Sequence, residues 1–323
     1  MWSPNAWTLI FKYVPPKLSI FKYVPPKLYM SYIEEKKING KTYLYLSNTV
    51  RVSKNKYKKI RQYIGNKLSD ISEIEYKLNK KIPVRPILKV KPTKLLELIK
   101  NNYLNKSNSK IVANILKTEK YRLYKFIYNT NNIEGNPLSF EDTKGILEKL
   151  KKTDKKRKRD EQEVVNMKYC LDYIIQTKDE ITLEFILNLH KMEMDNVHKE
   201  AGQLRNKQNI VNNYLPPKPE EVPKKMQELV EWYDKAKLKL HPFELAGLMH
   251  YKFVKIHPFM DGNGRMSRLL MNFILIKNNY PLLNINTTDK IKYYFVLMEQ
   301  KEKVGQRKFL NYLLETYVDE YYD

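Results

Sequence analysis

Twelve consecutive residues, His257 to Arg268, combine the side-chain types that phosphate chemistry requires. They read HPFMDGNGRMSR. The His257 imidazole, with an ordinary pKa of about 6.5, is able to accept a proton from an attacking hydroxyl. Asp261 offers a hard oxygen ligand of the kind that Mg²⁺ binds together with substrate phosphates. This combination predicts a transferase that acts on a nucleotide phosphate.

The glycines of this segment predict a turn that binds an anion. The proline after His257 interrupts the helix pattern, and Gly262 and Gly264 then favour a tight turn. We therefore expect His257 at the end of one helix and Arg265 at the start of the next. Backbone N–H groups at such a helix start bind phosphate. Arg265 and Arg268 are three residues apart, so they share a helix face and are able to hold phosphate oxygens.

The segment resembles the signature of Fic-domain proteins, H-P-F-x-D-G-N-G-R-x-x-R, and matches every defining position. Two other stretches extend the resemblance. GQLR at 202–205 and YLPPKP at 214–219 resemble the flap region of the family and the segment after it, and TNNIEGN at 130–136 resembles its inhibitory motif, [S/T]-x-x-x-E-[G/N]. The resemblance covers about residues 95–320 and implies a Fic-type helical bundle with a short β-hairpin flap.

The resemblance implies protein AMPylation, in which a Ser, Thr or Tyr hydroxyl of a protein attacks the α-phosphorus of ATP. ATP is then the substrate and Mg²⁺ the cofactor, held by Asp261. Glu134 of the inhibitory motif would form a salt bridge with Arg268 and so restrain it from binding the γ-phosphate. The catalytic residues implied are His257, Asn263 and Arg265. The phosphate-binding residues implied are Gly262, Asn263, Gly264, Arg265 and Arg268.

Target and adenine recognition are also implied by the resemblance. Tyr293 and Tyr294 would contact the adenine. Asn209 departs from the family, which often has an apolar residue there, and Asp289-Lys290 replaces an arginine common before the paired tyrosines. The flap, which would bind the target backbone as an added strand, comprises Gln208, Asn209, Ile210, Val211, Asn212 and Asn213.

Composition and patterning predict a mainly α-helical protein. The chain has 323 residues, a single cysteine and no long uncharged apolar run, which excludes a disulfide framework and argues against a membrane span. We expect a cytoplasmic protein. Helix-period apolar patterns occupy most of the chain after residue 94, including 109–128 and 289–320. The predicted divisions are 1–30 as a disordered leader containing a duplicated IFKYVPPKL, 31–68 as an antiparallel β meander, 69–94 as a linker, 95–180 as a helical segment with the inhibitory helix, and 181–320 as the Fic core.

The N-terminal part of the chain is strongly basic. The formal net charge is +24, and residues 1–92 contain 20 Lys and Arg against 5 Asp and Glu. Basic residues interleaved with tyrosines on a small sheet are typical of nucleic-acid binding, so residues 31–92 could bind nucleic acid. The alternative is a solvated sheet beside a catalytic domain.

Other functions remain open from the sequence. The same Fic site could remove AMP from a protein or transfer another phosphate or nucleotide group, although Gly262 and Gly264 favour nucleotidyl transfer over the kinase-type relatives. A basic nucleic-acid-binding regulator is a second class. A metal hydrolase built on His241, His250 and His257 is disfavoured, because their spacings of nine and seven do not place two ligands one helical turn apart. The expected partners are ATP, an unnamed protein target or the chain itself, and a second copy in a homodimer.

Overall fold

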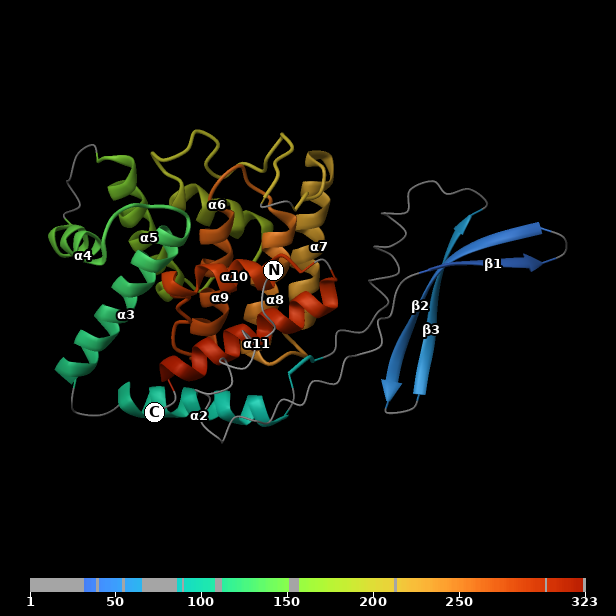
Figure 1. Cartoon of the computed structure of the whole chain (residues 1–323), viewed down its shortest axis with the longest axis horizontal. Coiled ribbons are helices and arrows are strands. Elements are labelled where there is room, and N and C mark those ends of the chain that lie inside the picture. The colour runs from blue at the N-terminus through green and yellow to red at the C-terminus, as the bar shows by residue number, and fades with distance from the viewer. Residues whose placement is uncertain are drawn as a thin grey trace, which may run out of the picture. The chain divides into compact units, whose positions relative to one another are not determined.

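The chain divides into two compact units, Met1–Pro83 and Val84–Asp323 (Figure 1). The computed structural model describes residues 32–38, 41–53, 56–65, 86–88, 90–107, 112–150, 157–211, 214–299 and 301–321. Within these ranges the first unit holds the strands and the second holds the helices. No helix in the described ranges has the length and apolar character that a membrane crossing requires.

Three antiparallel strands make up the described part of the first unit, in the segment where the sequence predicts a meander. They are β1 (Tyr32–Ile38), β2 (Lys41–Ser53) and β3 (Lys56–Gly65), hydrogen-bonded in that order. Both pairings are antiparallel, and the β2–β3 register shifts by one residue near each end of the pairing. The Asn39-Gly40 turn between β1 and β2 lies outside the described residues.

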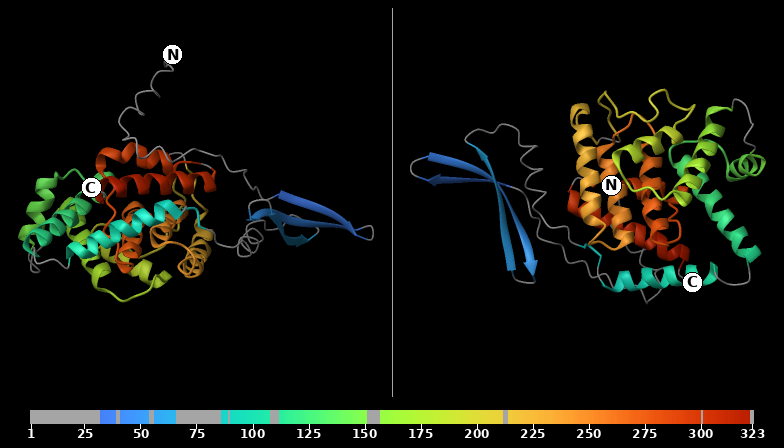
Figure 2. Two further views of the ribbon diagram at one scale, coloured as in Figure 1. Left: turned by 90° about the horizontal axis from the view of Figure 1, so that it is seen from below. Right: turned by 180° about the vertical axis from the view of Figure 1, so that it is seen from behind.

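The second unit is helical, as the periodicity predicts. Figure 2 shows this unit from below and from behind. Its elements are α2 (Val90–Ser107), α3 (Val112–Ile133), α4 (Phe140–Lys149), α5 (Arg159–Gln176), α6 (Leu183–Glu193), η3 (Pro219–Glu221), α7 (Val222–Ala236), α8 (Pro242–Ile256), α9 (Asn263–Lys277), η4 (Thr287–Asp289), α10 (Lys290–Leu297) and α11 (Glu302–Tyr321).

Helix α9 lies at the centre of this unit. It contacts α3, α5, α6 and α8, and residues on every side of it are buried. A helix that is apolar all round is expected in such a position, but α9 also buries Arg265, Arg268 and Asn272. Asn272 is satisfied by the backbone of Leu283, which it contacts through both its oxygen and its nitrogen. The two arginines therefore need partners from neighbouring helices.

Several boundaries differ from those that the sequence predicts. The helix predicted at 109–128 continues to Ile133, because the asparagines at its end are buried against the core. The pattern at 289–320 is divided between η4, α10 and α11, with a break after Leu297. The second motif helix begins at Asn263 and not at Arg265, so Gly264 is helical. The predicted leader 1–30 and the flap residues Asn212 and Asn213 lie outside the described residues.

Candidate active site

His257 ends helix α8 in a left-handed conformation, with φ 51° and ψ 61°. Such a conformation is uncommon for a residue with a side chain and is maintained here by contacts on both sides. Arg205 donates its Nε–H to the His257 carbonyl at 2.7 Å and its backbone N–H to the Pro258 carbonyl at 2.9 Å. Arg205 belongs to the GQLR stretch of the sequence, and its structural role is to fix the start of the motif loop.

The environment of His257 keeps its imidazole neutral. Burial, reinforced by the positive charge of Arg205, lowers the pKa of His257 to about 4. Both effects disfavour the protonated ring, and they outweigh the opposite influence of Glu134 and Asp261. A neutral imidazole is the form that is able to accept a proton from a hydroxyl.

The loop between the two helices is closed by its own side chains and by α6. Asn263 donates from Nδ2 to the Phe259 carbonyl at 2.8 Å and accepts from the Phe259 N–H at 2.9 Å. Gly262 has φ 79°, and a Cβ there would lie 2.6 Å from Oε2 of Glu193. His190 stacks on Phe259 with ring centroids 3.5 Å apart. Asn263 thus acts as a clamp on the loop, and only glycine fits at 262.

Gly264 lies in the first turn of α9 and leaves room for Glu134. A Cβ at this position would approach Oε1 of Glu134 to 2.1 Å. Glu134 follows the last residue of α3 and donates its N–H to the Asn131 carbonyl. The start of α9, where unpaired N–H groups and the helix dipole favour an anion, is therefore adjacent to a carboxylate of the same chain.

Arg268 is buried and contacts α3 and α10. Its Nη2 lies 2.7 Å from Oε1 of Glu134 and donates to the Thr130 carbonyl at 3.0 Å. Its Nε donates to the Thr130 hydroxyl at 2.7 Å. Its Nη1 donates to the Tyr293 hydroxyl at 3.2 Å. Arg268 is 2% exposed at its side chain and Glu134 is 28% exposed. The structure thus brings the two residues of the predicted salt bridge into contact.

The paired tyrosines differ in their surroundings. Tyr293 is buried, and its hydroxyl lies 2.9 Å from Nε2 of His250 as well as near Arg268. Tyr294 is only half-buried and donates to the Ile133 carbonyl at 3.4 Å. Tyr293 therefore accepts a hydrogen bond from Arg268 inside the protein, and Tyr294 is the tyrosine of the pair that has accessible surface.

Arg265 is enclosed by carboxylates, which the sequence analysis did not foresee. Its Nε lies 2.8 Å from Glu193 of α6, and its Nη1 lies 3.2 Å from Glu163 of α5. Glu193 is 1% exposed, and burial raises its pKa to about 7, although the Arg265 charge acts in the opposite direction. Arg265 is thus held inside the protein by α5 and α6.

Asp261 lies at the rim of the loop with its side chain 39% exposed. One oxygen accepts from the Gly262 N–H at 2.6 Å, and the other lies 3.1 Å from Nη2 of Arg159. No group of three or more His, Cys, Asp or Glu within the described ranges could hold a metal ion. A single exposed carboxylate fits Mg²⁺ that is carried mainly by substrate phosphates and water.

The flap region contains one isolated β-bridge. Val211 and Tyr214 exchange N–H to carbonyl hydrogen bonds at 2.9 and 2.8 Å. The Tyr214 hydroxyl donates to the Lys255 carbonyl of α8 at 2.9 Å, and Gln208 donates to the Pro216 carbonyl at 3.1 Å. Ile210 is 73% exposed. Of the predicted flap, the described residues thus include one bridge position, Val211, whose partner Tyr214 is hydrogen-bonded to the end of α8.

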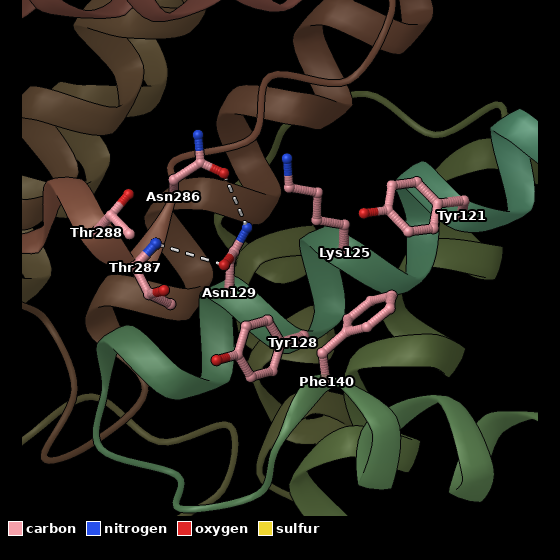
Figure 3. Close-up of a pocket in the computed structure, with 8 residues that line it drawn as sticks. All are labelled: Tyr121, Lys125, Tyr128, Asn129, Phe140, Asn286, Thr287 and Thr288. Carbon is pink, nitrogen blue, oxygen red and sulfur yellow. Dashed lines mark hydrogen bonds between the residues drawn. The ribbon is translucent and has the colours of Figure 1, made fainter.

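A cavity of about 250 Å³ lies where α3 meets the segment around η4. Figure 3 shows the residues that line it. Asn129 links the two elements, since its amide donates to Asn286 at 3.4 Å and accepts from the Thr287 N–H at 3.4 Å. It also donates to buried Asn284 at 3.1 Å. Asn129 precedes Thr130, so these bonds fix the end of α3 that carries Glu134.

The central part of the chain matches a known family. Residues 180–275 match the model of the Fic/DOC family. A protein adenylyltransferase Fic of Nematostella vectensis is 38% identical over 181 residues, which are 54% of this chain and 42% of that protein. The corresponding protein of Drosophila erecta is 37% identical over 190 residues, which are 57% and 38% of the two chains. The chain thus spans about two fifths of these curated relatives.

Solved structures show the same fold. A Fic-domain-containing signaling protein from Bacteroides thetaiotaomicron has a TM-score of 0.61 at 27% identity and covers 71% of this chain and 94% of its own. Fic-1 of C. elegans, residues 134–508, has a TM-score of 0.62 at 27% identity and covers 71% and 69%. Both alignments extend well beyond the residues that the family model matches.

Proposed function

Because residues 180–275 form a Fic domain, we propose that this protein transfers AMP from ATP to a hydroxyl of a protein. The observation that carries the proposal is the position of a neutral His257 at the end of α8, joined by a five-residue loop to the N-terminus of α9. A base and an anion site in this order suit an attack on a phosphate. The curated relatives carry the name of this activity.

In the proposed reaction, His257 accepts the proton of a Ser, Thr or Tyr hydroxyl. The hydroxyl oxygen forms a bond to the α-phosphorus of ATP, and the bond from that phosphorus to the bridging oxygen breaks. Pyrophosphate leaves with the electron pair. General-base assistance of this kind contributes about 10²- to 10⁴-fold to a rate.

The loop and the first turn of α9 bind the phosphates in this proposal. The backbone N–H groups around Gly262, Asn263 and Gly264 would bind phosphate oxygens at the start of α9, where the helix dipole adds to the attraction, and the Gly262 N–H would exchange its contact with Asp261 for one with the phosphate. Asp261 would hold Mg²⁺, which when bound neutralises charge on the phosphates. Arg265 would act on the phosphates through its positive charge and not by direct hydrogen bonds, because its donors already contact Glu163 and Glu193.

Glu134 restrains the site in the arrangement that the structure describes. Its carboxylate lies 2.7 Å from Arg268 and fills the space above Gly264. A γ-phosphate that approached Arg268 would meet this negative charge. We therefore propose that the protein is autoinhibited and that displacement of Glu134 permits ATP to bind productively.

Recognition of adenine and target is assigned to the remaining predicted residues. Tyr294 is the proposed adenine contact, because Tyr293 is buried beneath Arg268. The flap at 208–213 is the proposed docking strand for the target, and exposed Ile210 offers it an apolar side chain. Homodimer formation also remains a prediction, which the mass of the purified protein in solution would test.

The test compares wild type, Glu134→Gly and His257→Ala with Mg²⁺ and ATP labelled at either the α- or the γ-phosphate. We expect protein-bound label from the α position alone, weak in wild type, strong in Glu134→Gly and absent in His257→Ala. Transfer of the γ label would instead identify a kinase. Release of AMP from a modified protein, without any incorporation, would identify the reverse activity and contradict the proposal.

A further inference from the structure

The three-stranded sheet of the first unit separates its residue types between two faces. Successive residues of a strand alternate between faces, and residues paired across strands share a face. The register pairs Glu34 with Tyr45 and Tyr45 with Tyr63, so these three positions lie on one face. By the same register this face contains all the tyrosines between residues 32 and 65, namely Tyr32, Tyr43, Tyr45, Tyr57 and Tyr63.

Positive charge gathers on the same face. Its acidic residue is Glu34, and its basic residues are Lys36, Lys41, Arg51, Lys59 and Arg61. The opposite face has Glu35, Lys37 and Lys58, and it collects most of the aliphatic positions, namely Ile33, Leu44, Leu46, Val50 and Ile60, while Ile38 lies on the tyrosine face. A lysine-rich composition spread evenly over the unit would place tyrosines on both faces. The observed separation is therefore a property of this sheet and not of overall composition.

Two of the tyrosines form a direct ring contact. The ring centroids of Tyr45 and Tyr63 are 5.5 Å apart, with their planes at 57°, and Tyr63 is 45% exposed. Tyr63 lies near the end of β3 and follows two basic positions of the same face, Lys59 and Arg61. The face thus has aromatic and basic positions next to one another.

We infer that this tyrosine-rich face binds single-stranded nucleic acid. Unpaired bases stack on aromatic rings regardless of sequence, while the basic residues attract the backbone phosphates. An anionic membrane would be expected to engage cations together with the aliphatic residues, which here lie on the opposite face. An acidic protein segment would use the charges but would not require a tyrosine at every second or third position of the face.

The binding is measured by fluorescence anisotropy with the full-length protein and a labelled 12-nucleotide oligo(dT) or oligo(U). If all five basic residues neutralise phosphates, the logarithm of the affinity falls against the logarithm of salt concentration with a slope of about −3.5. A hairpin duplex of the same length serves as the comparison probe. Equal affinity for the duplex would overturn the inference, since duplex bases are not free to stack.

Neighbouring lysines supply a matched control. Lys59 lies on the tyrosine face and Lys58 on the aliphatic face, so Lys59→Glu and Lys58→Glu make the same charge change on opposite sides. We expect Lys59→Glu to weaken binding about tenfold or more and Lys58→Glu to change it by less than about threefold. Equal losses would show attraction to overall charge and would overturn the assignment of the face.

Stacking is tested at Tyr63. Tyr63→Ala removes the ring and should weaken binding at least about fivefold, whereas Tyr63→Phe keeps the ring and should bind as wild type does. Circular dichroism of the alanine variant shows whether its loss of binding reflects misfolding of the sheet. Competition by polyglutamate as effective as that by oligo(dT) would contradict the inference. His257→Ala, which removes the proposed transferase base, should bind the oligonucleotides unchanged.

Discussion

Two arginines one turn apart on α9, Arg265 and Arg268, are both buried, yet their partners differ in kind. Arg265 contacts Glu163 and Glu193, which extend from α5 and α6 inside the helical unit and are 8% and 1% exposed at their side chains. A third carboxylate, Asp261, lies 3.5 Å from its Nη2. Arg268 contacts a single carboxylate, Glu134, which lies beyond the end of α3 and is 28% exposed. Its other partners are neutral.

The difference separates a permanent ion pair from a releasable one. Removing one partner of a buried ion pair leaves an uncompensated charge in the core, so the Arg265 contacts are retained as long as the protein is folded. Arg268 keeps three neutral acceptor contacts when Glu134 leaves, and the carboxylate of Glu134 gains full hydration. A phosphate oxygen would then bind Arg268 in place of the Glu134 carboxylate.

The largest effect is expected from Glu193. Glu193→Ala should lower the free energy of unfolding by about 3–5 kcal/mol, because it removes the shortest of the carboxylate contacts of buried Arg265 and leaves Glu163 at 3.2 Å and Asp261 at 3.5 Å. Glu134→Ala should lower it by less than Glu193→Ala does, since Arg268 keeps its three neutral acceptors on Thr130 and Tyr293. Urea denaturation of both variants measures the difference. Similar losses would contradict the comparison of the two arginines.

The second effect concerns activity. Glu134→Gln removes the charge that competes with a γ-phosphate and should raise AMP transfer about tenfold over wild type, since about 1.4 kcal/mol corresponds to that factor. Glu163→Gln makes the same chemical change beside Arg265 and should not raise transfer at all. The assay is incorporation of α-labelled ATP at a fixed enzyme concentration. Activation by Glu163→Gln would show that the Arg265 contacts are releasable too.

The third expectation is a pH profile. The pKa of His257 is lowered to about 4, so the imidazole remains a base throughout the range above that value. In Glu134→Gly, kcat/KM should stay nearly constant as pH falls from 7 to about 5 and decline as it passes through about 4. Tyrosine fluorescence at each pH shows whether the protein is folded. A decline centred at about 6.5 would indicate an exposed histidine.

The smallest effect is expected at Arg159, whose guanidinium contacts Asp261 on the exposed rim. The two side chains are 59% and 39% exposed, so their attraction is worth less than about 1 kcal/mol. Arg159→Gln should therefore lower the Mg²⁺ concentration needed for ATP binding by about two- to fivefold. Titration calorimetry of ATP at several Mg²⁺ concentrations measures this. Lys158→Gln, which removes one positive charge from the exposed neighbouring residue, is the control for the change in net charge.

The sequence predicted the parts of the site that are contiguous in the chain. His257, Asp261, Asn263 and Arg268 stand in one short segment and Glu134 in a second motif, and the structure brings Glu134 into contact with Arg268. The helical class also followed from periodicity. The shared signal in both cases is local spacing.

The partners of Arg265 could not be predicted in this way. Glu163 and Glu193 lie on separate helices, about 100 and about 70 residues before α9 in sequence respectively, and no motif includes them. The available clue was indirect, because an arginine in an apolar helix requires a buried partner. The burial of Tyr293 was likewise hidden, since two adjacent tyrosines give no indication of which one faces the core.

Glu134 stands one residue beyond the helical end of α3, followed by Gly135 with φ 101°. Asn129 and Thr130 hold the preceding turn to neighbouring elements. The carboxylate is therefore able to leave Arg268 by rotation about its own side-chain bonds while the helix stays in place. Such rotations take picoseconds to nanoseconds, whereas helix displacements take microseconds or longer. Opening of the site would thus be fast compared with a catalytic turnover, and a partner that captured the displaced carboxylate would set how long it stays open.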